Sequence, residues 1–151
     1  MEEKLKVCEV KLTYKSKIKV SEREQVQSSE KAYKLLLSVF DTETIQYRES
    51  LKMLLLNRAN KVLGICSISE SGTNETSADL HLIMQAAILG NAFGIILAHN
   101  HPSGHLKPSL ADDQLTQRVK EVTKLLDIHL HDHLIITDES YYSYADEGHI
   151  I

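Results

Sequence analysis

The pattern of apolar and polar positions divides the chain into segments with the period of a strand or of a helix. Two apolar runs, residues 51–56 and 62–68, flank a short polar turn, so we expect a β-hairpin there. A third run, residues 94–97, is β-branched and bounded by glycine, which is typical of a buried strand. Two further strands are expected over residues 128–137 and 141–145.

Helical spacing characterises three other segments. Behind the serine N-cap Ser28, apolar side chains at steps of three and four predict a helix that ends near Asp41. Residues 82–89 are apolar almost all round, as expected of a helix buried against a sheet. A longer helix with one apolar stripe is expected after Ser109.

The N-terminal residues 4–20 have a different pattern, because apolar side chains alternate with lysine or other polar ones. This period of two predicts a half-buried strand, and lysine on the solvated face of an edge strand discourages aggregation. An alternative is that the lysines meet an acidic partner. We assign residues 1–28 to a strand-like N-terminal extension and residues 29–151 to the main domain.

Length and composition indicate one soluble globular domain. The chain has 151 residues, of which 42% are hydrophobic and 25% charged. No apolar run approaches the roughly 18–20 residues of a membrane span, and the N-terminus lacks the apolar stretch of a secretory signal. We therefore expect a cytoplasmic protein with no membrane attachment. Two cysteines, Cys8 and Cys66, are too few for a disulfide framework, and the net charge of −4 argues against non-specific binding of nucleic acid.

Candidate chemistry gathers directly after the 94–97 strand. His99 and His101, if still extended, place both imidazoles on one side of the chain, where they can converge on one ion. Asp112 is the best candidate for a third ligand, because a loop rich in turn-forming residues leads to it and can fold back. Two nitrogens and one oxygen, with a fourth position for water, are the donors of a catalytic zinc site.

An alternative for the same residues needs no metal. Ser109-x-x-Asp112 is also a capping-box pattern, in which the serine and the acidic residue satisfy free N–H groups of a helix. An isolated His-x-His is more often a pair of surface or hydrogen-bonded histidines than a metal site. His129, His131 and His133 would alternate onto one face and could mimic a metal cluster, but we expect them to be dispensable for the metal.

The combination of His-x-His, seven residues, Ser, two residues and Asp is similar to the JAMM motif of the MPN-type zinc metalloproteases. Within that superfamily, His-Asn-His-Pro-Ser-Gly resembles the RadC-like branch, bacterial proteins often labelled DNA repair proteins. The resemblance covers about residues 30–151. It also includes the segments Leu54–Val62, Ser71–Thr73, Ile95–Ala98, Asp132–Ile135 and Tyr142–Gly148. Leu80-His81 departs from it, since relatives usually carry Pro-Arg there.

This resemblance implies a single α/β domain of the JAMM/MPN type, with a mixed twisted sheet flanked by helices. It implies a zinc-dependent hydrolase of peptide or isopeptide bonds, with Zn²⁺ held by His99, His101 and Asp112. Glu49, just before the first hairpin strand, takes the place of the family's general acid/base; without the motif it would be a solvated strand-end carboxylate. Ser109, by family analogy, donates a hydrogen bond to the developing oxyanion unless its hydroxyl serves only the helix cap.

The alternative function is that of a DNA-repair-associated accessory protein with a metal-binding site and no protease activity. Full-length RadC-like members carry an N-terminal helix-hairpin-helix segment, for which residues 1–28 are too short. A non-catalytic MPN-type scaffold is a third class, but such scaffolds generally lose the metal ligands that this chain keeps. The sequence therefore favours a protein or peptide substrate over direct binding of nucleic acid.

Overall fold

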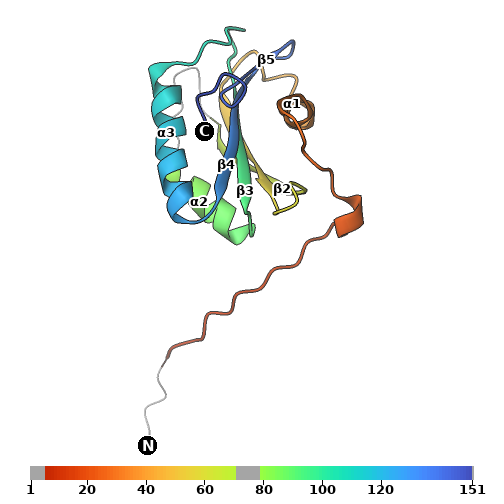
Figure 1. Ribbon diagram of the computed structural model, residues 1–151, viewed down its shortest axis with the longest axis vertical. Helices are drawn as coiled ribbons and strands as arrows, with labels where there is room; N and C mark the ends of the chain where they lie inside the picture. The colour runs from red at the N-terminus through yellow and green to blue at the C-terminus, as the bar shows by residue number, and fades with distance from the viewer. Residues whose placement is uncertain (1–5, 71–78, 151) are drawn as a thin grey trace, which may run out of the picture.

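The structure, a computed structural model, describes residues 6–70 and 79–150, so the Ser71–Thr73 segment of the resemblance lies outside it. Within the described residues, five strands form one mixed sheet in the order β2-β1-β3-β4-β5 (Figure 1). The strands are β1 Ser50–Leu56, β2 Val62–Glu70, β3 Gly94–Asn100, β4 His129–Ile136 and β5 Tyr141–Ser143. β1 and β2 form the expected hairpin, β3 and β4 run parallel, and the other neighbouring pairs are antiparallel.

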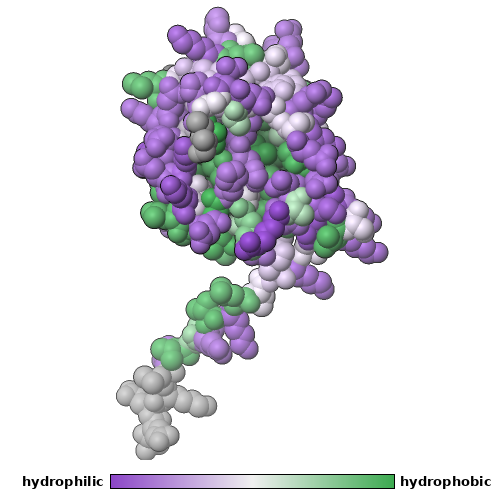
Figure 2. All heavy atoms as spheres, in the orientation of Figure 1, coloured by the Kyte–Doolittle hydropathy of each residue, from purple (hydrophilic) through white to green (hydrophobic). Residues whose placement is uncertain are grey.

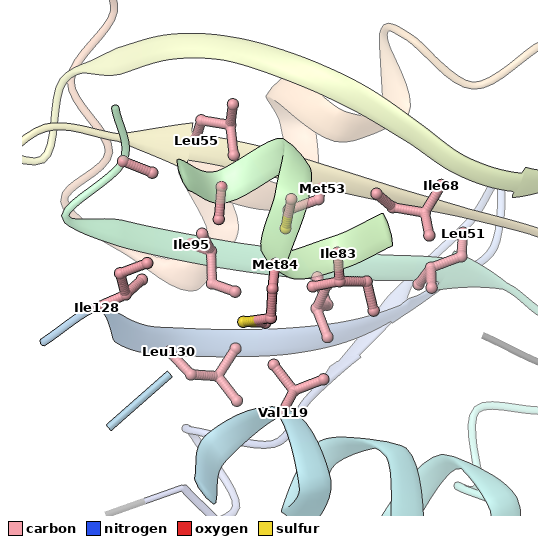
Figure 3. Close-up of a cluster of buried hydrophobic side chains, with 13 residues drawn as sticks. Leu51, Met53, Leu55, Ile68, Ile83, Met84, Ile95, Val119, Ile128 and Leu130 are labelled. Carbon is pink, nitrogen blue, oxygen red and sulfur yellow. The ribbon is translucent and has the colours of Figure 1, made fainter. Parts of the chain in front are cut away.

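Helices cover both faces of this sheet, which confirms the predicted α/β architecture (Figure 1). They are α1 Ser29–Leu37, α2 Leu80–Leu89 and α3 Leu110–Leu125. α1 packs on one face, where Leu36 is fully buried against Leu54 and Leu134. α2 and α3 pack on the other face, where Ile83 and Val119 meet the sheet residues of a second cluster (Figure 3). None of the helices in the described part of the chain is long and apolar enough to span a membrane.

Strand β3 lies in the middle of the sheet and carries the histidine motif at its carboxyl end. All its residues are buried, because β1 and β4 flank it and helices cover both of its faces. This explains why its sequence reads as a continuous apolar run rather than an alternating one. Such a strand is held on all sides, so it provides a rigid base for the side chains that follow.

A β-bulge interrupts the pairing of β3 with β4. Ile95 pairs with Leu130, whereas Ile96 pairs with Asp132, so His131 is the extra residue of β4. A bulge breaks the period of two, and the side chains beyond it change face. The expectation that the histidines at positions 129, 131 and 133 alternate onto one face is therefore wrong. The first two contact each other, whereas the ring of His133 packs against that of His99.

The strand predicted over residues 4–20 is also wrong for its described part. Residues 6–19 form no strand and extend away from the body of the domain (Figure 1). Apolar side chains are exposed along them (Figure 2). Leu12, for example, is 95% exposed. After the short 3₁₀ helix η1 (Val20–Glu22), pairing begins at Gln25, which forms an isolated antiparallel bridge with Lys61. An alternating pattern forms a strand only where a partner strand is available.

Candidate metal centre

His99 and His101 lie where β3 leaves the sheet. Residue 99 pairs with Leu51 of β1 and with Ile135 of β4, and its side chain is almost completely buried. The amide of His101 donates to the carbonyl of Ile136 at 3.1 Å, so β4 still guides the chain one residue beyond the strand. The extended backbone therefore turns both imidazoles to the same side, and their Nε2 atoms lie 2.9 Å apart.

Asp112 reaches these histidines from the first turn of α3. Its Oδ1 lies 3.1 Å from Nε2 of His99, and its Oδ2 lies 3.3 Å from Nε2 of His101. The capping box is present as well: the amide of Ser109 donates to Oδ2 of Asp112 at 2.7 Å, and the amide of Asp112 donates to Oγ of Ser109 at 3.1 Å. The two interpretations of this pattern are thus compatible, because the cap orients the carboxylate toward the imidazoles.

Glu49 faces the same group from the entrance of β1. Its Oε1 lies 3.9 Å from Nε2 of His99, and its side chain is 21% exposed. The buried side chain of Asn100 holds this segment to β3, since its amide donates to the carbonyls of Ile45 and Arg48 at 2.7 and 2.9 Å. Its Oδ1 accepts from the amide of Ser50 at 2.8 Å. The residue on either side of Glu49 is therefore tied to the strand that bears the histidines.

The structure brings together all three sequence-predicted ligands and the predicted acid/base residue. One ligand atom from each of Glu49, His99, His101 and Asp112 lies within 4.8 Å of every other. Ser109 adjoins this group, and its Oγ accepts the Asp112 amide, a bond that does not use the hydroxyl proton. Two nitrogens and carboxylate oxygens at such short separation can hold a metal ion.

The protonation of His101 suits metal binding. Its Nδ1 lies 2.7 Å from the carbonyl oxygen of His105. A carbonyl oxygen only accepts, so Nδ1 carries the proton, and the lone pair of the neutral ring is on Nε2. That lone pair points into the cluster, as a ligand must.

Charges in the cluster have two opposite effects on the binding of a metal ion. Burial alone raises the pKa of Asp112, but hydrogen bonds from His101 and His99 outweigh it and hold the pKa of that carboxyl well below its usual range. Burial likewise lowers the pKa of His101, but the contacts with Asp112 and with the His105 carbonyl outweigh it and raise that pKa. An ionised carboxylate therefore faces the rings at neutral pH, and a metal ion must displace a proton that His101 holds more tightly than usual.

Two further residues, which the sequence did not identify as part of the centre, also contact it. Nε2 of His133 lies 2.8 Å from Nδ1 of His99, and Oγ1 of Thr116 lies 2.6 Å from Nδ1 of His133. His133 is fully buried. One signal was present in the sequence, because Asp132–Ile135 belongs to the segments of the family resemblance. The assumed alternation of the neighbouring histidines obscured it.

A cavity of about 250 Å³ opens beside His101. The loop Pro102–Gly104 forms one wall, and Thr137–Glu139 forms another. Of the four clustered residues, His101 is the one that lines this cavity.

Comparisons with known proteins agree with this architecture. The model of a family described as the RadC-like JAB domain matches residues 26–149. A UPF0758 protein of Porphyromonas gingivalis is 48% identical over 127 residues, which are 83% of this chain and 55% of the relative. The UPF0758 protein YkfG of Escherichia coli is 39% identical over 101 residues, or 67% of this chain and 64% of the relative. The chain thus spans roughly half to two thirds of these relatives, whose names state no activity.

Proposed function

The chain belongs to the family of RadC-like JAB domains, and from that membership we propose that it is a zinc-dependent hydrolase of peptide or isopeptide bonds. The observation that carries the proposal is the convergence of Glu49, His99, His101 and Asp112 within 4.8 Å. Three of these residues supply the two-nitrogen, one-oxygen donor set of catalytic zinc, and the fourth is a carboxylate whose Oε1 lies 3.9 Å from Nε2 of His99.

The spacing of the donor atoms supports zinc. Ligands that lie roughly 2.0–2.1 Å from a tetrahedral ion are roughly 3.3 Å from one another. The separations between Nε2 of His99, Nε2 of His101 and the oxygens of Asp112 are 2.9, 3.1 and 3.3 Å. Zinc bound there supplies Lewis acidity, which polarises a carbonyl oxygen and makes water acidic enough to be a nucleophile near pH 7.

Glu49 and Ser109 complete the chemistry. We assign to Glu49 the role of taking the proton from the attacking water and returning it to the leaving amine. Its segment is anchored to the histidine strand by Asn100, which keeps base and ligands in register. Ser109, by family analogy, uses the proton of its hydroxyl to donate to the oxyanion while its oxygen accepts the Asp112 amide.

A protein or peptide is the substrate class that we propose. The cavity beside His101 gives room for a residue next to the scissile bond. The net charge of −4 disfavours the phosphate contacts that supply most of the affinity of DNA-binding proteins.

The test is a screen of peptide and isopeptide libraries with zinc-loaded protein. Glu49→Gln keeps the size of the side chain but removes the base, so we expect hydrolysis to fall by about 10²- to 10⁴-fold while zinc content is unchanged. Glu121→Gln, on the exposed side of α3, is the matched control and should retain full activity.

DNA titrations at two salt concentrations address the alternative function. We expect weak binding to labelled duplex and single strands. Tight, salt-sensitive binding together with no cleavage that depends on Glu49 would overturn the hydrolase proposal in favour of an accessory protein.

A further inference from the structure

We propose that Thr116 and His133 are positioning residues that fix the tautomer of His99 and direct the lone pair of its Nε2 into the metal centre. The inference rests on the proposed metal centre and adds two residues to it, and for His133 it replaces the expectation that this histidine is dispensable for the metal. It follows from the direction of a chain of hydrogen bonds that runs from α3 through β4 to β3.

The direction of the chain is set at Thr116. Its Oγ1 lies 2.8 Å from the carbonyl oxygen of Asp112 and 2.6 Å from Nδ1 of His133. The carbonyl oxygen can only accept, so the single hydroxyl proton of Thr116 goes to Asp112. Thr116 then has only lone pairs to offer to His133, and Nδ1 of His133 must be the donor.

The same logic passes through His133 to the ligand. A neutral ring with its proton on Nδ1 has its lone pair on Nε2, and this atom lies 2.8 Å from Nδ1 of His99. His99 therefore donates from Nδ1, which leaves a lone pair on its own Nε2. That atom is the one that faces His101 and Asp112.

This arrangement selects metal binding over an internal hydrogen bond. With the proton on Nδ1 in both rings, Nε2 of His99 and Nε2 of His101 present lone pairs to each other at 2.9 Å, and Oδ1 of Asp112 adds negative charge at 3.1 Å. Such groups repel one another unless a metal ion, or a proton held by His101, lies between them. The opposite tautomer of His99 would donate from Nε2 and close the centre without an ion.

Packing keeps the relay in place. His133 is fully buried, and the ring of Tyr144 stacks on it at 5.1 Å between centroids with 9° between the planes. The hydroxyl of Tyr144 donates to Asp113 at 2.7 Å, so this stacking ring is itself tied to α3. Thr116 stands one turn after Asp112 on the same helix. Helix α3 thus provides one ligand directly and orients another through His133.

Thr116→Val tests the relay, because valine has nearly the same shape and no hydroxyl. Without that acceptor, His133 is released to donate from Nε2, and His99 shifts its proton to Nε2. We expect zinc affinity, measured by competition with a chelator, to fall about 10- to 100-fold, the usual effect of losing an outer-shell partner. Thr116→Ser restores the hydroxyl and should bind zinc as wild type does.

Thr123→Val is the matched control. Thr123 is another buried threonine of α3, and its hydroxyl donates to the carbonyl of Lys120 rather than to a histidine. It should lose stability on a similar scale to Thr116→Val but keep its affinity for zinc. A loss of affinity shared by both variants would show a structural effect and overturn the proposal.

Nitrogen NMR of the histidine rings in zinc-free protein gives a second readout, independent of zinc. We expect the proton of His99 on Nδ1 in wild type and in Thr123→Val, and on Nε2 in Thr116→Val. An unchanged tautomer in Thr116→Val would overturn the relay. Zinc binding that depends on Thr116 in a protein that cleaves no amide would leave the relay standing and reject the hydrolase proposal instead.

Discussion

Two of the His-x-His pairs of the chain lie on neighbouring parallel strands, but at opposite ends of them. The site pair, His99 and His101, is at the carboxyl end of β3, whereas the distal pair, His129 and His131, is at the amino end of β4. Ring centroids are 4.8 Å apart in the site pair and 4.4 Å apart in the distal pair. Proximity of two imidazoles therefore does not distinguish a metal centre from a pair of packed rings.

The availability of carboxylate oxygens does distinguish them. Asp112 turns both of its oxygens to the site pair. Near the distal pair, Asp132 lines the same cavity as His131. Its oxygens, however, accept hydrogen bonds from the hydroxyl of Ser143 and from the backbone amides of His133 and Ala145. Of these two pairs, only the site pair belongs to the group of described residues that could hold a metal ion. A histidine pair can therefore form a metal site only if a nearby carboxylate still directs lone pairs toward the two rings.

The largest expected difference between the two pairs is in zinc content. Elemental analysis of purified wild-type protein should find nearly one zinc per chain. His99→Ala combined with His101→Ala should abolish it, because no nitrogen ligand remains. His129→Ala combined with His131→Ala should retain it. Zinc that survives the first replacement or disappears with the second would mean that the wrong pair has been identified.

Removal of zinc by a chelator should lower the stability of the distal-pair variant but not that of the site-pair variant. A ligand present at about 100 times its dissociation constant stabilises the folded state by about 2.7 kcal/mol. Removal of zinc at such a concentration should therefore lower the free energy of unfolding by about that amount in wild type and in the distal-pair variant. Urea unfolding measures the change. The site-pair variant should show none, and an equal loss in all three proteins would locate the zinc elsewhere.

The serines that cap the nearby helices provide a finer comparison. Ser109 caps α3 beside the site pair, and Ser28 caps α1 beside the distal pair, where it lines a cavity with His131. Replacing either by alanine should cost about 1 kcal/mol in zinc-free protein, as for other N-caps. With zinc bound, Ser109→Ala should cost more, because the cap also orients Asp112. Equal costs with and without zinc would show that the cap has no part in orienting the ligand.

The smallest expected difference is in how the stability of zinc-free protein depends on pH, because His131 and His101 contribute with opposite signs. Burial and the charge of His129 lower the pKa of His131. The contribution of His131 to stability is therefore present above about pH 6.5 and is lost as pH falls through the lowered pKa. Burial lowers the pKa of His101 too, but Asp112 and the His105 carbonyl outweigh it. The contribution of His101 to stability is present below about pH 6.5 and is lost as pH rises through the raised pKa.

Unfolding free energies measured between about pH 5.5 and 8 test these signs. His131→Gln should reduce the loss of stability on the acid side, whereas His101→Gln should reduce the loss on the neutral side. Parallel curves for the two variants would contradict the assigned environments.

Local signals predicted most of the elements. The hairpin, the three helices and the buried strand before His99 follow from periodicity and caps that lie within each segment. The candidate ligand set followed from the spacing of a motif and its resemblance to a family. Two features depend on pairing with distant residues, and local periodicity could not reveal them. One is the bulge at His131, which brings His133 to the site; the other is the lack of a partner strand for residues 6–19.

The side chain of Asn100 has a consequence for the chemical ageing of the protein. Its amide nitrogen supplies both donors that hold the carbonyls of Ile45 and Arg48. Deamidation would turn this nitrogen into an oxygen, and the resulting carboxylate would face two carbonyl oxygens with no proton to share. The segment that carries Glu49 would then separate from the strand that carries the histidines. A change of one atom in an aged sample would thus displace Glu49 from the candidate centre while leaving His99, His101 and Asp112 chemically unchanged.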